Sequence, residues 1–166
     1  MRRKRREPKV SSVPSSFQVI ENHQQRVRLS LPELERFFKR MSRELGLSGE
    51  SAFVRFVDNA EMAKLNRRFR KKPKTTDVLS FPAQKRTCPR ALRLRTRQLR
   101  GVFLGDIAIS PAVAHGNARA LGRSVTQEIC ILMLHGVLHL LGYDHETDRG
   151  KMERVEAKLR ERLGLS

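Results

Sequence analysis

The fold of this chain depends on residues 127–145, which read Q-E-I-C-I-L-M-L-H-G-V-L-H-L-L-G-Y-D-H. From Ile129 to Leu141 every residue is apolar except two histidines and a glycine, a pattern that predicts a helix buried in the core. The run is too short to cross a bilayer, which needs about 18–20 apolar residues. Gly142 occupies the position that commonly ends a helix. We therefore expect the other elements to pack around this helix.

Three histidines in this stretch predict a metal site. His135 and His139 stand four residues apart, so a helix projects both from one face, and His145 follows after the glycine turn. Imidazoles on a dry face are costly unless each ring nitrogen has a partner, which a metal ion would supply. Three imidazoles leave a fourth position open on tetrahedral zinc, although nickel and copper also accept this ligand. The alternative is a set of core histidines bonded to backbone or acidic groups.

The spacing H-x-x-x-H-x-x-G-x-x-H matches the zinc pattern of metzincin proteases, except that Gly136 stands where those enzymes carry a glutamate base. We interpret this glycine as a device that keeps space beside the metal open for a bulky phosphodiester. A metallopeptidase is therefore a weaker alternative.

The charge of the chain predicts a polyanionic partner. Its 166 residues carry a net charge of +18 and a pI of about 11.3, which favours nucleic acid first and an acidic membrane surface second. Aromatic residues make up only 5% of the chain, with no tryptophan, so a stacking platform for single strands is not expected. Phosphate contacts would then dominate binding.

The location expected from the sequence is the cytoplasm. The basic start, residues 2–6, is not followed by the apolar segment of a secretory signal, and we expect no membrane segment. Two cysteines, Cys88 and Cys130, form neither a disulfide framework nor a cysteine-type zinc site, which fits a reducing compartment.

The expected fold is α+β: a single compact domain, residues 17–166, in which one small mixed sheet packs against helices that include the buried, histidine-bearing one. A basic tail at 1–16 and a basic exposed loop at 83–100 extend from it. Strands are expected at 17–21, 51–57, 78–81 and 102–109. Helices are expected at 31–45, from 59 to about 70, at 111–121, at 125–141 and at 148–163.

Further polar residues stand out near these elements. A basic run closes the second helix and is a predicted RNA-binding surface, the alternative being a solvated helix end; it comprises Arg67, Arg68, Arg70, Lys71, Lys72 and Lys74. Asp106 lies among apolar residues of the last strand, and Asp144 precedes the third histidine. Both carboxylates are expected to support the metal ligands.

Three blocks of the chain resemble the YbeY family of rRNA-maturation endoribonucleases: L-N-R-R-F-R followed by T-T-D-V-L-S-F-P, then L-G-D-I-A-I-S, then H-G-V-L-H-L-L-G-Y-D-H. The resemblance covers roughly residues 17–163. It implies a single-strand-specific, zinc-dependent endoribonuclease that acts in 16S rRNA 3′-end maturation and ribosome quality control. It also implies one zinc per chain on His135, His139 and His145, a functional arginine at Arg70, and partners that include precursor rRNA, the ribosome and assembly proteins.

The expected mechanism combines the residue-based inference of a metal site and a polyanionic partner with the resemblance to YbeY endoribonucleases. Zinc would polarise a phosphoryl oxygen and activate water, while Arg70, with Lys71 or Lys72, offsets charge that develops on the scissile phosphate. The general base is not assigned by the sequence: the candidates are zinc-activated water, the RNA 2′-hydroxyl and a carboxylate such as Asp144. The non-enzymatic alternative is an rRNA- or ribosome-binding factor with a structural zinc.

Overall fold

The computed structural model describes residues 19–48, 51–83, 102–145 and 147–165. These residues form a four-stranded sheet and five helices, which confirms the predicted α+β fold with a small mixed sheet. The predicted tail 1–16 and all but Ala83 of the predicted loop 83–100 lie outside the described residues. The elements run β1 (Ile20–Asn22), α1 (Leu31–Glu44), β2 (Ala52–Phe56), α2 (Asn59–Arg70), β3 (Val78–Pro82), β4 (Gly105–Ile109), α3 (Pro111–Ala120), α4 (Val125–Leu140) and α5 (Lys151–Arg162).

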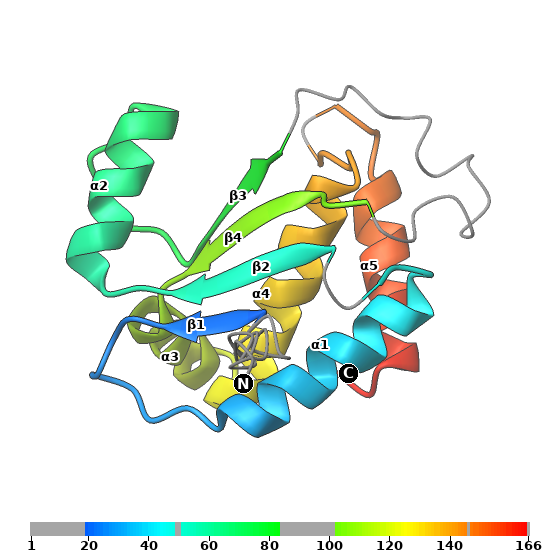
Figure 1. Cartoon of the computed structure of the whole chain (residues 1–166), viewed down its shortest axis with the longest axis horizontal. Helices are drawn as coiled ribbons and strands as arrows, with labels where there is room; N and C mark the ends of the chain where they lie inside the picture. Colours follow the sequence, from blue (N-terminus) through cyan, green and yellow to red (C-terminus); the bar gives the residue numbers. More distant parts are fainter. Residues whose placement is uncertain (1–18, 49–50, 84–101, 146, 166) are drawn as a thin grey trace, which may run out of the picture.

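The sheet has the order β1-β2-β4-β3, and its two faces are covered unequally (Figure 1). β1, β2 and β4 are parallel, while the edge strand β3 runs antiparallel to β4. Helices α1, α3, α4 and α5 lie on one side, whereas α2 stands on the other. Because side chains alternate along a strand, Ile107 of β4 joins the large core with α4, and its neighbour Ala108 joins a small cluster with Met62 of α2.

Helix α4 is the central buried helix that the apolar run predicts. Its buried residues come from every side of the helix, and only a few positions, including His135 and His139, are partly exposed. Ser124 caps it by accepting a hydrogen bond from the backbone N–H of Gln127 at 3.1 Å. The Gln127 side chain donates to the Leu165 carbonyl at 3.5 Å, so it connects α4 to the C-terminal segment.

The surface helices also begin and end largely where the sequence predicts. Asp58 caps α2 by accepting from the N–H of Glu61 at 2.8 Å, and Ser110 caps α3. Pro32 lies in the first turn of α1, and the buried face of that helix comprises Leu34, Phe37, Phe38, Met41 and Ser42. Among the described residues, no helix combines the length and the apolar content that a membrane span requires.

Three elements differ from the prediction by more than one residue. β1 covers residues 20–22, and the first two residues of the predicted strand 17–21 lie outside the described part of the chain. β4 starts at Gly105 instead of 102, where the backbone has φ +145° and a Cβ would lie 2.1 Å from the Phe81 carbonyl oxygen. α5 starts at Lys151 instead of 148, because the Asp148 carboxylate accepts N–H groups of residues 151 and 152 from a turn that precedes the helix.

Gly136 allows α4 to approach the sheet closely. A Cβ at this position would lie 2.9 Å from Ile107 Cγ2 and 3.2 Å from the Ser80 Oγ. That hydroxyl donates to the Gly136 carbonyl at 3.2 Å and so ties β3 to the helix. The glycine therefore serves helix–sheet packing, which replaces the interpretation that it keeps space open for a phosphodiester.

Gly136→Ala is expected to lower the free energy of unfolding by about 1–3 kcal/mol, because the added methyl overpacks the helix–sheet contact. Gly116→Ala is the matched control: an added methyl at this helical glycine of α3 would have no neighbour within 4 Å, so the change should stabilise the protein by about 0.5–1 kcal/mol. Urea denaturation of both variants measures the difference. Equal effects of the two substitutions would contradict the packing role of Gly136.

Candidate metal centre

The first two histidines project from one turn of α4 near its C-terminal end. His135 and His139 are half-buried, while the helix residues around them are almost all buried. The helix ends in a Schellman turn, in which the N–H of Gly142 donates to the His139 carbonyl at 2.9 Å and the N–H of Tyr143 to the Leu138 carbonyl at 3.1 Å. Gly142 has φ +91°, which suits glycine, and the turn directs the chain back toward the histidines.

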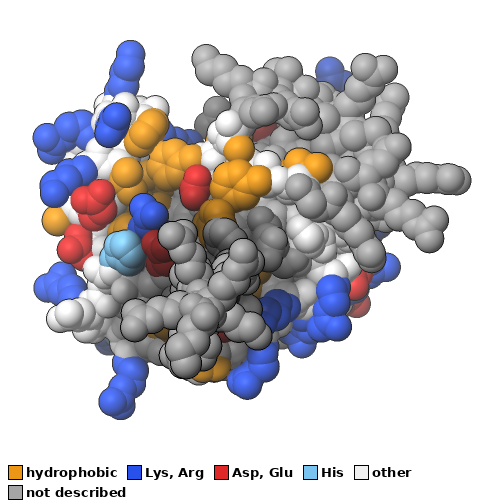
Figure 2. Space-filling model, in the orientation of Figure 1, with side chains coloured by type: hydrophobic (Ala, Val, Ile, Leu, Met, Phe, Trp, Pro, Cys, Tyr) orange, Lys and Arg blue, Asp and Glu red, His pale blue; other side chains and the backbone are white. Residues whose placement is uncertain are grey.

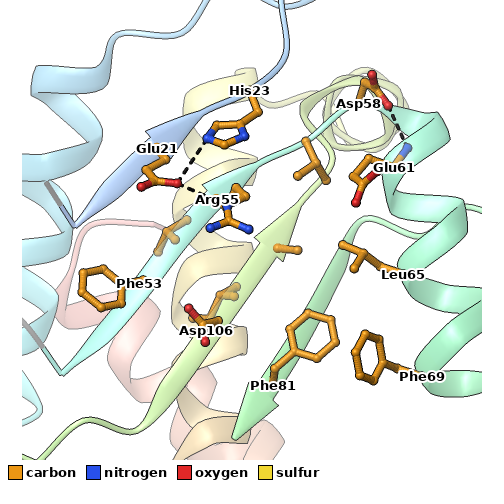
Figure 3. A pocket seen from close by; sticks show the side chains of 14 residues that line it. Glu21, His23, Phe53, Arg55, Asp58, Glu61, Leu65, Phe69, Phe81 and Asp106 are labelled. Atoms are coloured by element: carbon orange, nitrogen blue, oxygen red, sulfur yellow. Dashed lines mark hydrogen bonds and ion pairs between the residues drawn. The ribbon is translucent and has the colours of Figure 1, made fainter. Parts of the chain in front are cut away.

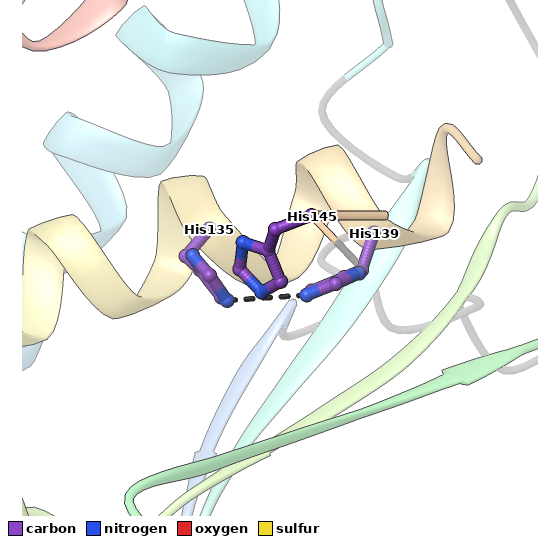
Figure 4. Close-up of side chains that lie close together, drawn as sticks. All are labelled: His135, His139 and His145. Carbon is purple, nitrogen blue, oxygen red and sulfur yellow. Dashed lines mark hydrogen bonds between the residues drawn. The ribbon is translucent and has the colours of Figure 1, made fainter. Parts of the chain in front are cut away.

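This turn brings His145 beside the other two rings, as Figure 4 shows. The ring centroids of His135 and His139 are 4.7 Å apart, and His145 lies 4.9 Å from each. One nitrogen of each ring belongs to a set whose atoms all lie within 4.8 Å of one another, so the three side chains could hold one metal ion. The grouping that the sequence spacing suggests is therefore present in the fold.

The tautomers of His135 and His139 follow from their partners. His139 Nδ1 lies 2.9 Å from the Tyr143 carbonyl oxygen, which only accepts, so this nitrogen donates its N–H. His135 Nδ1 lies 3.0 Å from Oε2 of Glu156 and donates in the same way to the carboxylate. In each neutral ring the lone pair is thus left on Nε2.

The two Nε2 atoms face each other at 3.1 Å. With both protons held on Nδ1, two lone pairs meet there, and a cation is the partner that satisfies both. Two nitrogens bound to one tetrahedral zinc at about 2.0–2.1 Å stand roughly 3.3 Å apart, close to the separation seen here. The donor set therefore fits a divalent metal bound by imidazole.

Electrostatics favour the neutral form of His139. Burial lowers the pKa of His139, and the neighbouring His135 and His145 lower it further, against smaller opposing effects of the Tyr143 carbonyl and Asp144. A neutral imidazole is the form that binds a metal.

Glu156 of α5 orients His135, and sequence reasoning missed it. Burial alone would raise the pKa of this carboxyl, but the hydrogen bond with His135 and the charges of His135 and Arg160 outweigh burial and lower the pKa. Arg160 Nη2 contacts Glu156 Oε1 at 2.6 Å. The sequence feature that could have identified Glu156 is its position: it is an acidic residue on the inward face of an amphipathic helix, between Met152 and Leu159.

The two aspartates expected near the ligands lie in different places. Asp144 is half-buried in the turn between the second and third histidines, where its charge acts on His139 and its carboxylate accepts from the Thr147 hydroxyl at 3.2 Å. Asp106 is exposed and lines a hollow on the α2 side of the sheet, away from α4 (Figure 3). Strand alternation turns Asp106 away from the face to which Ile107 belongs, so this placement does not support a role around the metal ligands.

The predicted RNA-binding cations gather at the C-terminal end of α2. All are exposed, and they comprise Arg67, Arg68, Arg70, Lys71, Lys72 and Lys74. Asn66 closes this end by donating to the Lys74 carbonyl at 2.6 Å. Within the described residues no hydrogen bond or ion pair joins Arg70 to the three histidines, because α2 and α4 pack on opposite faces of the sheet.

Comparison with known proteins finds one consistent family. The family described as "Endoribonuclease YbeY" matches residues 19–164. A protein of that name from Solibacter usitatus is 45% identical over 137 residues, 82% of either chain, and one from Koribacter versatilis is 42% identical over 82% of this chain and 80% of its own. A solution structure of a Thermotoga maritima protein is similar with a TM-score of 0.56 at 26% identity, and the match covers 87% of each chain.

Glu156→Gln is expected to weaken metal binding by about 10–100-fold, because the amide no longer provides the negative charge that orients and polarises His135. Glu153→Gln is the matched control, since Glu153 is exposed on the same helix. Titration with Co²⁺, followed by its visible absorption, measures both affinities. An unchanged affinity in Glu156→Gln would show that the carboxylate has no part in the site.

Proposed function

This chain belongs to the endoribonuclease YbeY family, and we propose on that premise that it cleaves single-stranded RNA with a bound zinc ion. The observation that carries the proposal is the convergence of three imidazoles, two of which have their Nε2 lone pairs 3.1 Å apart and their Nδ1 protons held elsewhere. Zinc suits this site because it accepts three imidazoles and retains an open position.

When bound, the zinc ion supplies Lewis-acid chemistry to a phosphodiester group. The protein's own contribution is to hold the ligands rigidly. Helix α4 fixes two of them by its buried position, Glu156 and the Tyr143 carbonyl fix the ring orientations, and the turn after Gly142 fixes the third. Such preorganisation lowers the cost of binding both metal and substrate.

Charge supports RNA as the substrate. The net charge of +18 and the exposed basic end of α2 attract phosphates and hold a strand without reading its sequence. Within that end, Arg70 is proposed to contact the scissile phosphate and to offset its developing charge. The absence of a carboxylate at Gly136 counts against a peptidase of the metzincin type.

The proposed process is rRNA maturation in the cytoplasm, with 16S rRNA 3′-end processing and ribosome quality control as its specific roles. The resemblance to YbeY endoribonucleases supports this assignment, and ribosomal or assembly proteins are the proposed partners. Cys130, a free thiol inside α4, fits a reducing compartment; burial raises its pKa to about 12, so it stays protonated and inert.

The proposal is tested by single-turnover cleavage of labelled single-stranded RNA. The zinc-loaded wild type should cut the strand, and chelation should abolish cutting. His139→Ala should lose both the bound zinc, measured by elemental analysis, and the cleavage, because a ligand is removed. His115→Ala is the control, since that histidine is exposed on α3. Full cleavage by zinc-free protein or by His139→Ala would refute a metal-dependent nuclease.

Arg70→Ala is expected to lower the cleavage rate by about 100-fold while changing RNA affinity by less than about threefold. One cation among many contributes little to binding, whereas a cation at the reacting phosphate stabilises the transition state. Arg67→Ala, on the same exposed helix end, serves as the control and should change both quantities little. Equal losses of rate and affinity in Arg70→Ala would remove the catalytic role.

A further inference from the structure

Asp106 lies in the middle of a row of side chains on the α2 side of the sheet. The register pairs it with Phe53 of β2 on one side and with Phe81 of β3 on the other. Neighbouring strands lie about 4.8 Å apart, so the carboxylate stands directly between two phenyl rings. Figure 3 shows this row, with the Asp106 carboxylate turned into the open space in front of the sheet.

Helix α2 covers only part of this face and leaves a hollow of about 1050 Å³, a size typical of ligand sites. Phe69 of α2 borders it, is 56% exposed, and meets Phe81 edge to face with ring centroids 4.9 Å apart. Phe103, 41% exposed, stands 5.3 Å from Phe53. In Figure 2 hydrophobic side chains gather on this face beside the blue cations over α2. The fold thus assembles an aromatic surface that the low aromatic content does not reveal.

The other acids that line the hollow are engaged. Glu21 forms an ion pair with Arg55 at 3.2 Å, Asp58 caps α2, and Glu61 lies 3.7 Å from a lysine one turn further along. Asp106, by contrast, forms neither a hydrogen bond nor an ion pair within the part of the chain that the structure describes. Both of its carboxylate oxygens are therefore acceptors for a ligand in the hollow.

A carboxylate set between aromatic rings recognises a flat group that carries two adjacent N–H donors. Guanine has such a pair, N1–H and N2–H, on its Watson–Crick edge, and a carboxylate accepts both in parallel. Adenine, cytosine and uracil each present an acceptor beside their donor on that edge. Phenyl rings stack on any base, as in single-strand RNA-binding sheets that use aromatic residues on adjacent strands.

The basic end of α2 beside the hollow favours RNA over a cationic peptide, whose arginine also carries paired donors. Phe69 stands within the exposed basic run 67–72, and the Arg68 guanidinium lies 5.3 Å from its ring centroid. These cations attract the phosphates that flank a base and repel a positively charged segment.

We propose that the hollow between α2 and the sheet binds a guanine base of single-stranded RNA, with Phe53, Phe69 and Phe81 as stacking surfaces and Asp106 as the acceptor of its N1–H and N2–H. The inference rests on the proposed function, since it gives the nuclease a base-binding site remote from the metal ligands. It predicts a preference for guanine at a fixed distance from the cleaved bond.

The test measures binding of guanosine, inosine, adenosine and cytidine 5′-monophosphates to the full chain by NMR titration. Wild type should bind the guanosine nucleotide about tenfold more tightly than the others, and inosine, which lacks one donor, should lose most of that gain. Asp106→Asn should abolish the preference, while the matched control Glu61→Gln retains it. Phe69→Leu should weaken binding of every nucleotide several-fold through lost stacking.

The outcomes separate this inference from the proposed function, because a mononucleotide contains no phosphodiester bond to cleave. Equal affinities for all four nucleotides, or a preference that survives in Asp106→Asn, would overturn the guanine site even if RNA is cleaved. An arginine-rich peptide that binds wild type but not Asp106→Asn, with no nucleotide preference, would overturn it in favour of a protein docking surface. Guanine selectivity that depends on Asp106 supports it, whether or not cleavage is observed.

Discussion

Burial of α4 with two imidazoles on one of its faces is the constraint on which the rest of the structure depends. A polar ring in a dry environment requires a partner at each nitrogen, and the fold provides fixed acceptors for both Nδ1 atoms. One acceptor is a backbone carbonyl in the turn that ends the helix, and the other is Glu156 on α5. With these partners in place, the remaining lone pairs face a common point, which is the electrostatic condition for a bound cation.

The sheet connects this metal face to a second surface of different character. Because side chains alternate along β4, Ile107 lies in the core under α4 and Asp106 lies on the opposite side. The same strand therefore borders both the core under α4 and the hollow on the α2 side. The close contact of Gly136 with Ile107 fixes α4 on the first face. On the second face α2 leaves the sheet partly open, and its basic end stands beside the aromatic hollow. Positive charge and exposed rings are thereby combined on the side away from the histidines.

The sequence predicted features that depend on local spacing and failed for those that depend on distant contacts. The positions of the helices and the grouping of the histidines follow from residues within one or two turns. The partnership of Glu156 with His135 joins two helices, and no local pattern specifies it. The row of Phe53, Asp106 and Phe81 depends on the pairing of three strands and on which helix packs against which side of β4. The low aromatic content predicted no stacking platform for single strands, and a count of aromatic residues does not tell which of them strand register places on one face.

The measurement that tests the central claim most directly is a long-range ¹H–¹⁵N NMR spectrum of the histidine side chains before and after one equivalent of zinc. We predict Nδ1-protonated tautomers for both helix histidines throughout, because the fixed acceptors hold those protons. Their Nε2 resonances should shift when zinc is added, since the lone pairs on those atoms bind the metal. A proton on Nε2 of either helix histidine in the neutral, metal-free protein, or Nε2 resonances that zinc leaves unchanged, would contradict this picture of the site.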